Sequence, residues 1–329
     1  AGMQARMSTS SDCSIVLVHG RDFKPAEEDL RDISYRALRA GVRRDYPDCV
    51  PLLEDAQFEL AYYGDLTNAY LEGIGRRYDE QLDVGDRRNA HAALREIQPR
   101  KKFSIRQYDR VPGKSALREF AADMLAPVLG AIGLTMPLIR LVSKDAAEYL
   151  AGKTDLADKV RERVRAKLCE ALDRDGRVLL LSHGLGCIVA YDVLWELSHD
   201  EALAPRYAER KIEAWVTLGA PLGDMHVRKY LKGADQQPEA RFPTNVISWY
   251  NVAAEDDYTC HDNTLADDFK KMLHQRLVSA VHDYRIYNLA VRYGKSNPHS
   301  SLGYLVHPRT AQIIVEWLQN SPGLTALTE

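Results

Sequence analysis

Residues 177–192, RVLLLSHGLGCIVAYD, constrain the fold of this 329-residue chain more than any other stretch. Four consecutive aliphatic residues at 178–181 are typical of a parallel strand that is buried on both faces. The short segment SHGLG follows, and apolar residues then recur at helical spacing from Ile188 to Leu194. The stretch therefore predicts a buried strand, a sharp turn and a helix.

Short apolar strands and helical segments alternate along much of the chain. We expect strands at 14–18, 58–63, 211–218, 245–252 and 284–291, and helices at 27–46, 153–173 and 309–318. Residues 66–165 carry helical patterns without a convincing strand. We therefore predict an α/β protein whose core is formed by residues 1–65 and 166–329, with a helical cap or lid inserted at 66–165.

A strand that turns sharply into a helix beside small residues has the geometry of a nucleophile elbow. In this respect the chain resembles the α/β-hydrolase superfamily of lipases and esterases, whose elbow reads small-x-Ser-x-Gly. Ser182 aligns with the first small residue, Gly186 with the last glycine, and Gly184 with the nucleophile. The resemblance implies an α/β-hydrolase fold with a mostly parallel sheet flanked by helices. It also implies an acyl hydrolase for an ester or thioester substrate, in a form without its nucleophile.

The glycine at the nucleophile position is open to three explanations. The first, which we favour, is a replacement of serine by Gly184 that silences the enzyme. The second is a naturally non-catalytic relative that keeps the pocket to bind a ligand or a partner. The third is a turn with no hydrolase behind it, and the match of the other segments argues against this one.

The resemblance also implies an oxyanion hole beside the first strand. Strand 14–18 runs into His19-Gly20-Arg21, the place of the family's oxyanion loop. Backbone N–H groups there would stabilise the negative charge of a tetrahedral intermediate. We assign this role to the N–H groups of Leu185 and Arg21, with Gly20 as the alternative to Arg21.

An acid is expected after a strand that follows the elbow. In the family it orients the catalytic imidazole and stabilises the positive charge of that ring. Relatives often carry an aspartate about six residues after an asparagine near the end of this strand. Counting from Asn251 gives Asp257, with Asp256 as the alternative.

The family carries its general base between the last strand and the last helix. His299 lies there, so the order elbow, acid, histidine is the family's order. His307 is nearer the start of the helix, and we expect it to cap or pack that helix. His282 is expected just before the last strand, at the wrong edge of the sheet.

Composition limits the possible partners. The net charge of −3, with 28% charged and 45% hydrophobic residues, is ordinary for a globular protein and gives no indication of nucleic-acid binding. The five cysteines lack the spacing of a zinc site or a disulfide framework, so we expect no metal and no other cofactor. The first residues lack the apolar core of a secretory signal, and a cytoplasmic location is expected.

Residues 124–139, MLAPVLGAIGLTMPLI, form an apolar segment within the expected cap. Sixteen residues are too few for a transmembrane helix, so we expect no membrane span. A kinked helix buried against the core is the simplest interpretation. A wall of an apolar pocket is the alternative, which would favour a small-molecule acyl substrate with a lipophilic part. Contact with a membrane surface and the oligomeric state stay open.

Overall fold

The computed structural model describes residues 12–97, 143–255, 257–260, 264–288, 290–292, 295–297 and 299–320. Two features singled out above lie outside these ranges. They are Asp256, the alternative acid, and the apolar segment 124–139.

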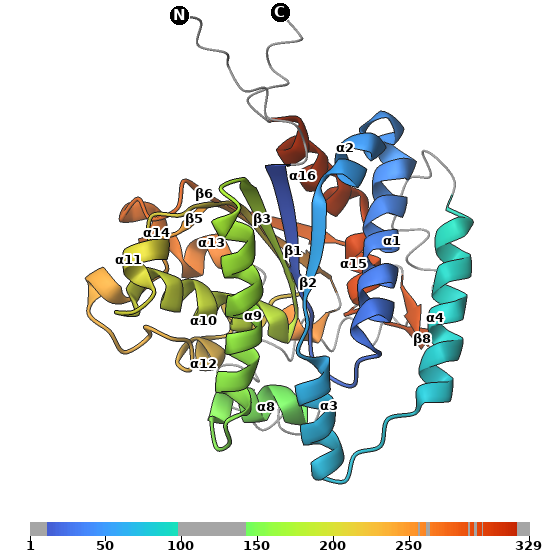
Figure 1. Ribbon diagram of the computed structural model, residues 1–329, viewed down its shortest axis with the longest axis horizontal. Helices are drawn as coiled ribbons and strands as arrows, with labels where there is room; N and C mark the ends of the chain where they lie inside the picture. The colour runs from blue at the N-terminus through green and yellow to red at the C-terminus, as the bar shows by residue number, and fades with distance from the viewer. Residues whose placement is uncertain are drawn as a thin grey trace, which may run out of the picture.

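A six-stranded sheet forms the centre of the molecule (Figure 1). Its strands, in chain order, are β1 (Cys13–Val18), β2 (Gln57–Ala61), β3 (Arg177–His183), β4 (Ile212–Leu218), β5 (Val246–Ala254) and β6 (Ala280–Ile286). Their spatial order is β2-β1-β3-β4-β5-β6, and each neighbouring pair is parallel. With helices on both faces of this sheet, the predicted α/β fold class is confirmed.

Two layers of helices enclose the sheet. The helices α1 (Glu27–Asp45), α2 (Val50–Asp55), α15 (Ser301–Leu305) and α16 (Pro308–Gln319) cover one face, and α9 (Leu156–Asp173) and α10 (Leu185–His199) cover the other (Figure 1). The remaining α-helices are α3 (Gly64–Gly73), α4 (Glu80–Arg95), α8 (Lys144–Ala151), α11 (Ala204–Tyr207), α12 (Met225–Arg228), α13 (Leu265–Asp268) and α14 (Lys270–His274). Short 3₁₀ helices lie at Pro47–Cys49, Pro221–Gly223, Pro238–Ala240 and Tyr258–Cys260.

Burial on both faces explains why the central strands are continuous apolar runs. All six residues of β1 are buried. Ile15 and Leu17 pack in the core under α1 and α16, whereas Val16 and Val18 pack in the core under α9 and α10. Since successive side chains of a strand point to opposite faces, a strand between two helical layers has few positions that favour a polar residue.

The prediction for the last strand was wrong at both ends. We expected residues 284–291, but β6 spans Ala280–Ile286, so His282 lies within the strand and not before it. The chain then enters a small antiparallel ribbon of β7 (Val291–Arg292) and β8 (Lys295–Ser296). Among the described residues β6 pairs only with β5, and it has one buried residue, Ile286, so its sequence lacks the apolar run that marks the inner strands.

The described part of the expected cap, within 66–165, is helical and contains no strand. It comprises most of α3, the whole of α4 and α8, and the first part of α9, so the boundary expected at residue 165 lies inside a helix. The division of the chain into core and cap stays a prediction. Among the residues that the structure describes, no helix has the length and apolar character needed to cross a bilayer.

The order of the strands points to one place for a site. The chain passes outward from β1 to β2, and then returns to the other side of β1 with β3 and continues outward to β6. This reversal leaves a crevice at the carboxyl ends of β1 and β3, where open α/β sheets bind their ligands. The loop after β1 and the turn after β3 both lie at this crevice.

Candidate active site

The turn after β3 is built around Gly184. The strand ends at His183 and α10 begins at Leu185, so one residue makes the whole turn. Gly184 has φ 54° and ψ −122°, a conformation that glycine adopts without the steric cost of a side chain. Its N–H donates to the Leu218 carbonyl at 3.0 Å, which extends the β3–β4 ladder to the tip of the turn. The strand, turn and helix predicted from the sequence are therefore present.

Two glycines bring the loop after β1 against this turn. A Cβ on Gly20 would lie 2.8 Å from His183 Nδ1 and 3.2 Å from the His183 carbonyl oxygen. A Cβ on Gly186 would lie 2.5 Å from the Val18 carbonyl oxygen and closer still to that of His19. Only residues without a side chain allow the two segments to approach so closely.

The loop that carries Arg21 is held by side chains from distant segments. Asp22, at φ 69°, donates its N–H to Asp145 Oδ2 at 2.7 Å, and Asp145 is fully buried at the start of α8. The ammonium group of Lys24 donates to the Arg21 carbonyl. The Lys24 N–H donates in turn to Asn68 Oδ1 at 2.9 Å. The loop is thus fixed beside the turn after β3.

Leu185 and Arg21, the predicted oxyanion donors, therefore lie on two segments that meet. Leu185 is the first residue of α10, and helix geometry leaves the N–H groups of the first turn without intrahelical acceptors. Their role as donors to a reacting oxygen, and that of the alternative Gly20, stays a prediction.

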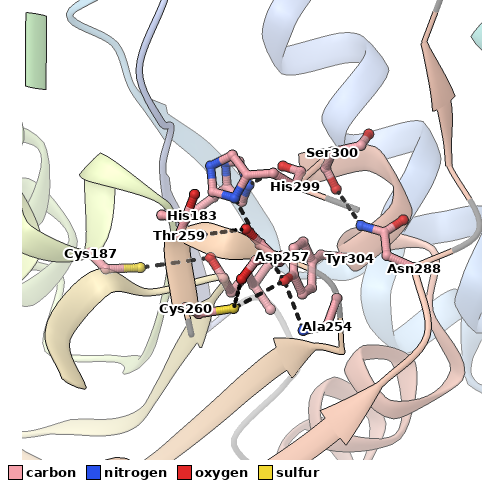
Figure 2. Close-up of polar contacts among 11 residues, drawn as sticks. His183, Cys187, Ala254, Asp257, Thr259, Cys260, Asn288, His299, Ser300 and Tyr304 are labelled. Carbon is pink, nitrogen blue, oxygen red and sulfur yellow. Dashed lines mark hydrogen bonds and ion pairs between the residues drawn. The ribbon is translucent and has the colours of Figure 1, made fainter. Parts of the chain in front are cut away.

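The predicted acid and base form a hydrogen-bonded pair (Figure 2). Asp257 lies three residues beyond the end of β5, and His299 lies just before α15. The Nδ1 atom of His299 lies 2.8 Å from Asp257 Oδ2. The Asp257 side chain is 1% exposed and that of His299 is 17% exposed, so water has little access to the carboxylate and more to the ring.

The Asp257 carboxylate accepts two further hydrogen bonds. The Tyr304 hydroxyl donates to Oδ2 at 2.7 Å, and the Thr259 N–H donates to Oδ1 at 3.0 Å. Burial alone would raise the pKa of this carboxyl. The facing His299 imidazole and the hydrogen bonds outweigh burial and hold the Asp257 pKa below its ordinary value. Asp257 is therefore ionised, and an ionised carboxylate can only accept, so Nδ1 of His299 carries the proton.

The other ring nitrogen of His299 faces Gly184. A Cβ built on Gly184 would lie 2.8 Å from His299 Nε2 and 3.1 Å from Cε1. This Nε2 atom is buried and has no hydrogen-bond partner among the described residues. The structure therefore brings Asp257, His299 and Gly184 together in this order, carboxylate, imidazole and turn, from three separate segments.

His183 also belongs to the site, although nothing in the sequence pattern singled it out. Its ring is buried 4.5 Å from the His299 ring, measured between centroids, and its Nε2 donates to the His299 carbonyl at 2.8 Å. Burial, and next the charge of His299, hold the pKa of His183 well below 6.5, so the ring is neutral. It fastens the turn after β3 to the segment before α15.

Tyr304 and Gly219 were missed as well. Gly219 has φ 58°, and a Cβ there would lie 2.7 Å from Asp257 Oδ2 and 3.1 Å from the Tyr304 ring. The sequence offers a signal for Gly219, the Gly-Ala-Pro turn that follows β4. It offers none for Tyr304, whose place depends on how α15 packs.

The side chains that could replace a nucleophile are engaged elsewhere. Ser182 Oγ accepts a hydrogen bond from the Trp215 indole at 2.9 Å. Burial raises the pKa of the Cys187 thiol to about 12, so the reactive thiolate does not form at neutral pH.

His307 accepts a hydrogen bond from the Arg309 N–H at 3.0 Å and caps α16, which is the role expected for it.

A cavity of about 980 Å³ opens beside His299 and runs between α1 and α4. His183, Gly20 and Arg21 line it near the turn. Its apolar lining includes Leu17, Leu30, Ile33, Leu94, Leu302 and Val306. Charged side chains, among them Lys24, Asp83 and Arg87, line the rest of it. A concave site of this size is typical of small-molecule binding.

In the part of the chain that the structure describes, no three His, Cys, Asp or Glu side chains are grouped as metal ligands. Comparison of the chain with protein-family models, with curated proteins and with solved structures finds no match in any of the three.

Proposed function

We propose that the chain is the scaffold of a serine-type acyl hydrolase of the α/β-hydrolase superfamily, in which Gly184 replaces the nucleophilic serine. Support comes from the order of the segments, in which a strand–turn–helix, an acid and a histidine follow one another as in that superfamily. The substrate class that we propose is an ester or thioester.

One observation carries the proposal. His299 Nε2 is buried, lacks a partner among the described residues, and lies 2.8 Å from the position of a Cβ on residue 184. A buried polar atom without a hydrogen bond costs about 1–3 kcal/mol. Once the imidazole has moved back from this contact to make room for the Cβ, a hydroxyl on residue 184 would remove this cost by donating to Nε2, because Nδ1 already donates to Asp257.

In a serine-bearing site, His299 Nε2 would take the hydroxyl proton as the serine oxygen attacks the carbonyl carbon. Asp257 would stabilise the resulting imidazolium, and the N–H groups of Leu185 and Arg21 would bind the oxyanion. The proton would then pass from His299 to the leaving group, and water would hydrolyse the acyl-enzyme. With Gly184 no acyl-enzyme forms. Loss of one triad member leaves a residual acceleration of ~10³–10⁴ over water.

The cavity indicates what part of a substrate could bind. It begins at His299, and aliphatic side chains such as Leu30, Ile33 and Leu94 line part of it, while charged side chains such as Lys24, Asp83 and Arg87 line the rest. Burial of apolar surface contributes roughly 0.8 kcal/mol for each CH₂ group. We therefore expect an acyl or alkyl chain of the substrate to bind along the aliphatic part of the wall.

The test is to introduce the nucleophile. Gly184→Ser, Gly184→Ala and Gly184→Ser with His299→Ala are compared on p-nitrophenyl esters from acetyl to dodecanoyl. Only Gly184→Ser is expected to hydrolyse them, with burst kinetics from acyl-enzyme formation and a preference for the longer chains. The alanine variant adds the same Cβ without the hydroxyl, so it controls for the strain at φ 54°. A folded serine variant as inactive as the alanine variant would contradict the proposal.

The second candidate is a naturally non-catalytic protein that holds a ligand in the same cavity. It is favoured by the tight approach of the imidazole, because a Cβ at residue 184 would need His299 Nε2 to retreat from 2.8 Å. In this case Gly184→Ser stays inactive, and long-chain fatty acids or their alcohols raise the Tm of the unaltered chain. No shift with these probes would remove this candidate.

A further inference from the structure

We propose that Tyr304 is a positioning residue for the proposed hydrolase site, because its hydroxyl fixes the orientation of the Asp257 carboxylate and makes this carboxylate a weaker hydrogen-bond acceptor for His299. The inference depends on the proposed function for its effect on catalysis. Its effect on the Asp257–His299 hydrogen bond can be measured in the chain as it stands.

The geometry leaves the Tyr304 proton one direction. The hydroxyl oxygen accepts from the Ala254 N–H at 3.0 Å and lies 2.7 Å from Asp257 Oδ2 (Figure 2). The N–H can only donate, and the ionised carboxylate is a much stronger acceptor than the Cys260 sulfur 3.7 Å away, so the hydroxyl proton points to the carboxylate. Tyr304 is fully buried, and burial and the Asp257 charge raise its pKa well above the ordinary value, so the proton remains at every pH of interest.

Tyr304 and His299 reach the same oxygen from the two ends of α15. Oδ2 lies 2.7 Å from the hydroxyl and 2.8 Å from Nδ1. Side chains hold the backbone at both ends, since His183 donates to the His299 carbonyl at 2.8 Å and Thr310 donates to the Tyr304 carbonyl at 2.7 Å. The short helix therefore sets the angle at which both donors meet the acid.

Two donors on one oxygen compete for its negative charge. A hydrogen bond from Tyr304 stabilises the carboxylate and makes it a weaker acceptor for the Nδ1 proton of His299. Without the hydroxyl, Asp257 would bind that proton more strongly and would also be free to rotate. Tyr304 thus limits how strongly the acid favours the charged imidazole, and so the pH range in which the ring is a free base.

The first test uses NMR of the His299 Nδ1–H proton, without any requirement for activity. Tyr304→Phe keeps the ring and removes the hydroxyl, and the resonance is expected to move downfield. Tyr149→Phe is the matched control, because the buried Tyr149 hydroxyl also donates at 2.7 Å to a buried aspartate, Asp192. The control should leave the resonance in place. An unmoved resonance in folded Tyr304→Phe, or an equal shift in both variants, would overturn the inference.

A second variant keeps the inference testable if Tyr304→Phe does not fold. Site-specific 3-fluorotyrosine at 304 retains the ring and makes the hydroxyl a stronger donor, so the Nδ1–H resonance should move upfield. A downfield shift or no shift would refute the inference.

The second test uses the pH profile of kcat/KM in Gly184→Ser. Adding Tyr304→Phe is expected to move the acidic limb of the profile to higher pH, whereas adding Tyr149→Phe should leave it unchanged. A merely structural role would lower the rate at all pH values and leave the limb in place, and that result would overturn the inference. If Gly184→Ser is inactive, the proposed function fails, while the NMR result still decides whether Tyr304 acts on Asp257.

Discussion

The contact between β1 and α10 makes a sharp prediction for Gly186→Ala. The new Cβ would lie 2.5 Å from the Val18 carbonyl oxygen, and real Cβ contacts are essentially never under 3.0 Å, so α10 must move away from β1 by at least 0.5 Å. Overpacking of this kind costs about 1–3 kcal/mol. Alanine in a helix regains at most about 0.5–1 kcal/mol. We therefore expect a lower free energy of unfolding, by about 1–2 kcal/mol.

The assay is urea denaturation, with Gly85→Ala as the matched control. Gly85 lies in α4, and a Cβ there would meet nothing within 4 Å. The control should raise the free energy of unfolding by the helix-propensity difference between alanine and glycine alone, about 0.5–1 kcal/mol. The two identical substitutions thus have opposite predicted signs. A Gly186→Ala variant at least as stable as the parent would refute the tight approach of the helix to the strand on which the site depends.

Two more stability changes follow from the same region. His19 is neutral in the fold because burial and the charge of Lys24 lower its pKa from 6.5 to about 3. Protonation therefore favours the unfolded chain, and the free energy of unfolding falls as the pH drops below 6.5, by about 2 kcal/mol at pH 5 from this group. Denaturation at pH 7 and at pH 5 should show a smaller loss of stability for His19→Gln than for the unaltered chain. Gly219→Ala places a side chain at φ 58° and 2.7 Å from Asp257 Oδ2. We expect it to lower the free energy of unfolding by about 2–4 kcal/mol and to displace the His299 Nδ1–H resonance. A variant with unchanged stability and an unchanged resonance would contradict the packing around the acid.

The sequence predicted the inner strands because burial on both faces leaves a strong signal. The run at 178–181 became β3, and every residue of that run is fully buried. The signal failed for β6, where one edge is unpaired and the side chains are mostly half-buried or exposed. There the apolar residues that follow the strand resembled the strand itself. Edge strands are thus harder to locate than central ones for a physical reason.

The residues of the candidate site likewise fall into those that could be predicted from the sequence and those that could not. Asp257 and His299 could be selected because the resemblance to the α/β-hydrolases implies an acid and a histidine on loops after the strands that follow the elbow, and a parallel sheet brings such loops to one edge. Tyr304 and His183 could not, because their roles depend on the packing of α15 and on the direction of one side chain. Each hydrogen-bonds to an acid or a carbonyl that lies more than 40 residues away.

Burial of the ionised Asp257 carboxylate is energetically unfavourable, and this cost is informative about the function of the site. An ionised carboxylate in the interior costs several kcal/mol unless its oxygens are hydrogen-bonded. The chain supplies Asp257 with His299, Tyr304 and the Thr259 N–H, and places Gly219 where any side chain would disturb the carboxylate. Apolar residues of similar size would often fill such a space with equal or greater stability. The arrangement has a direct use when the free nitrogen of the imidazole exchanges a proton with a group beside residue 184. The two functions that we propose therefore differ in what position 184 must carry.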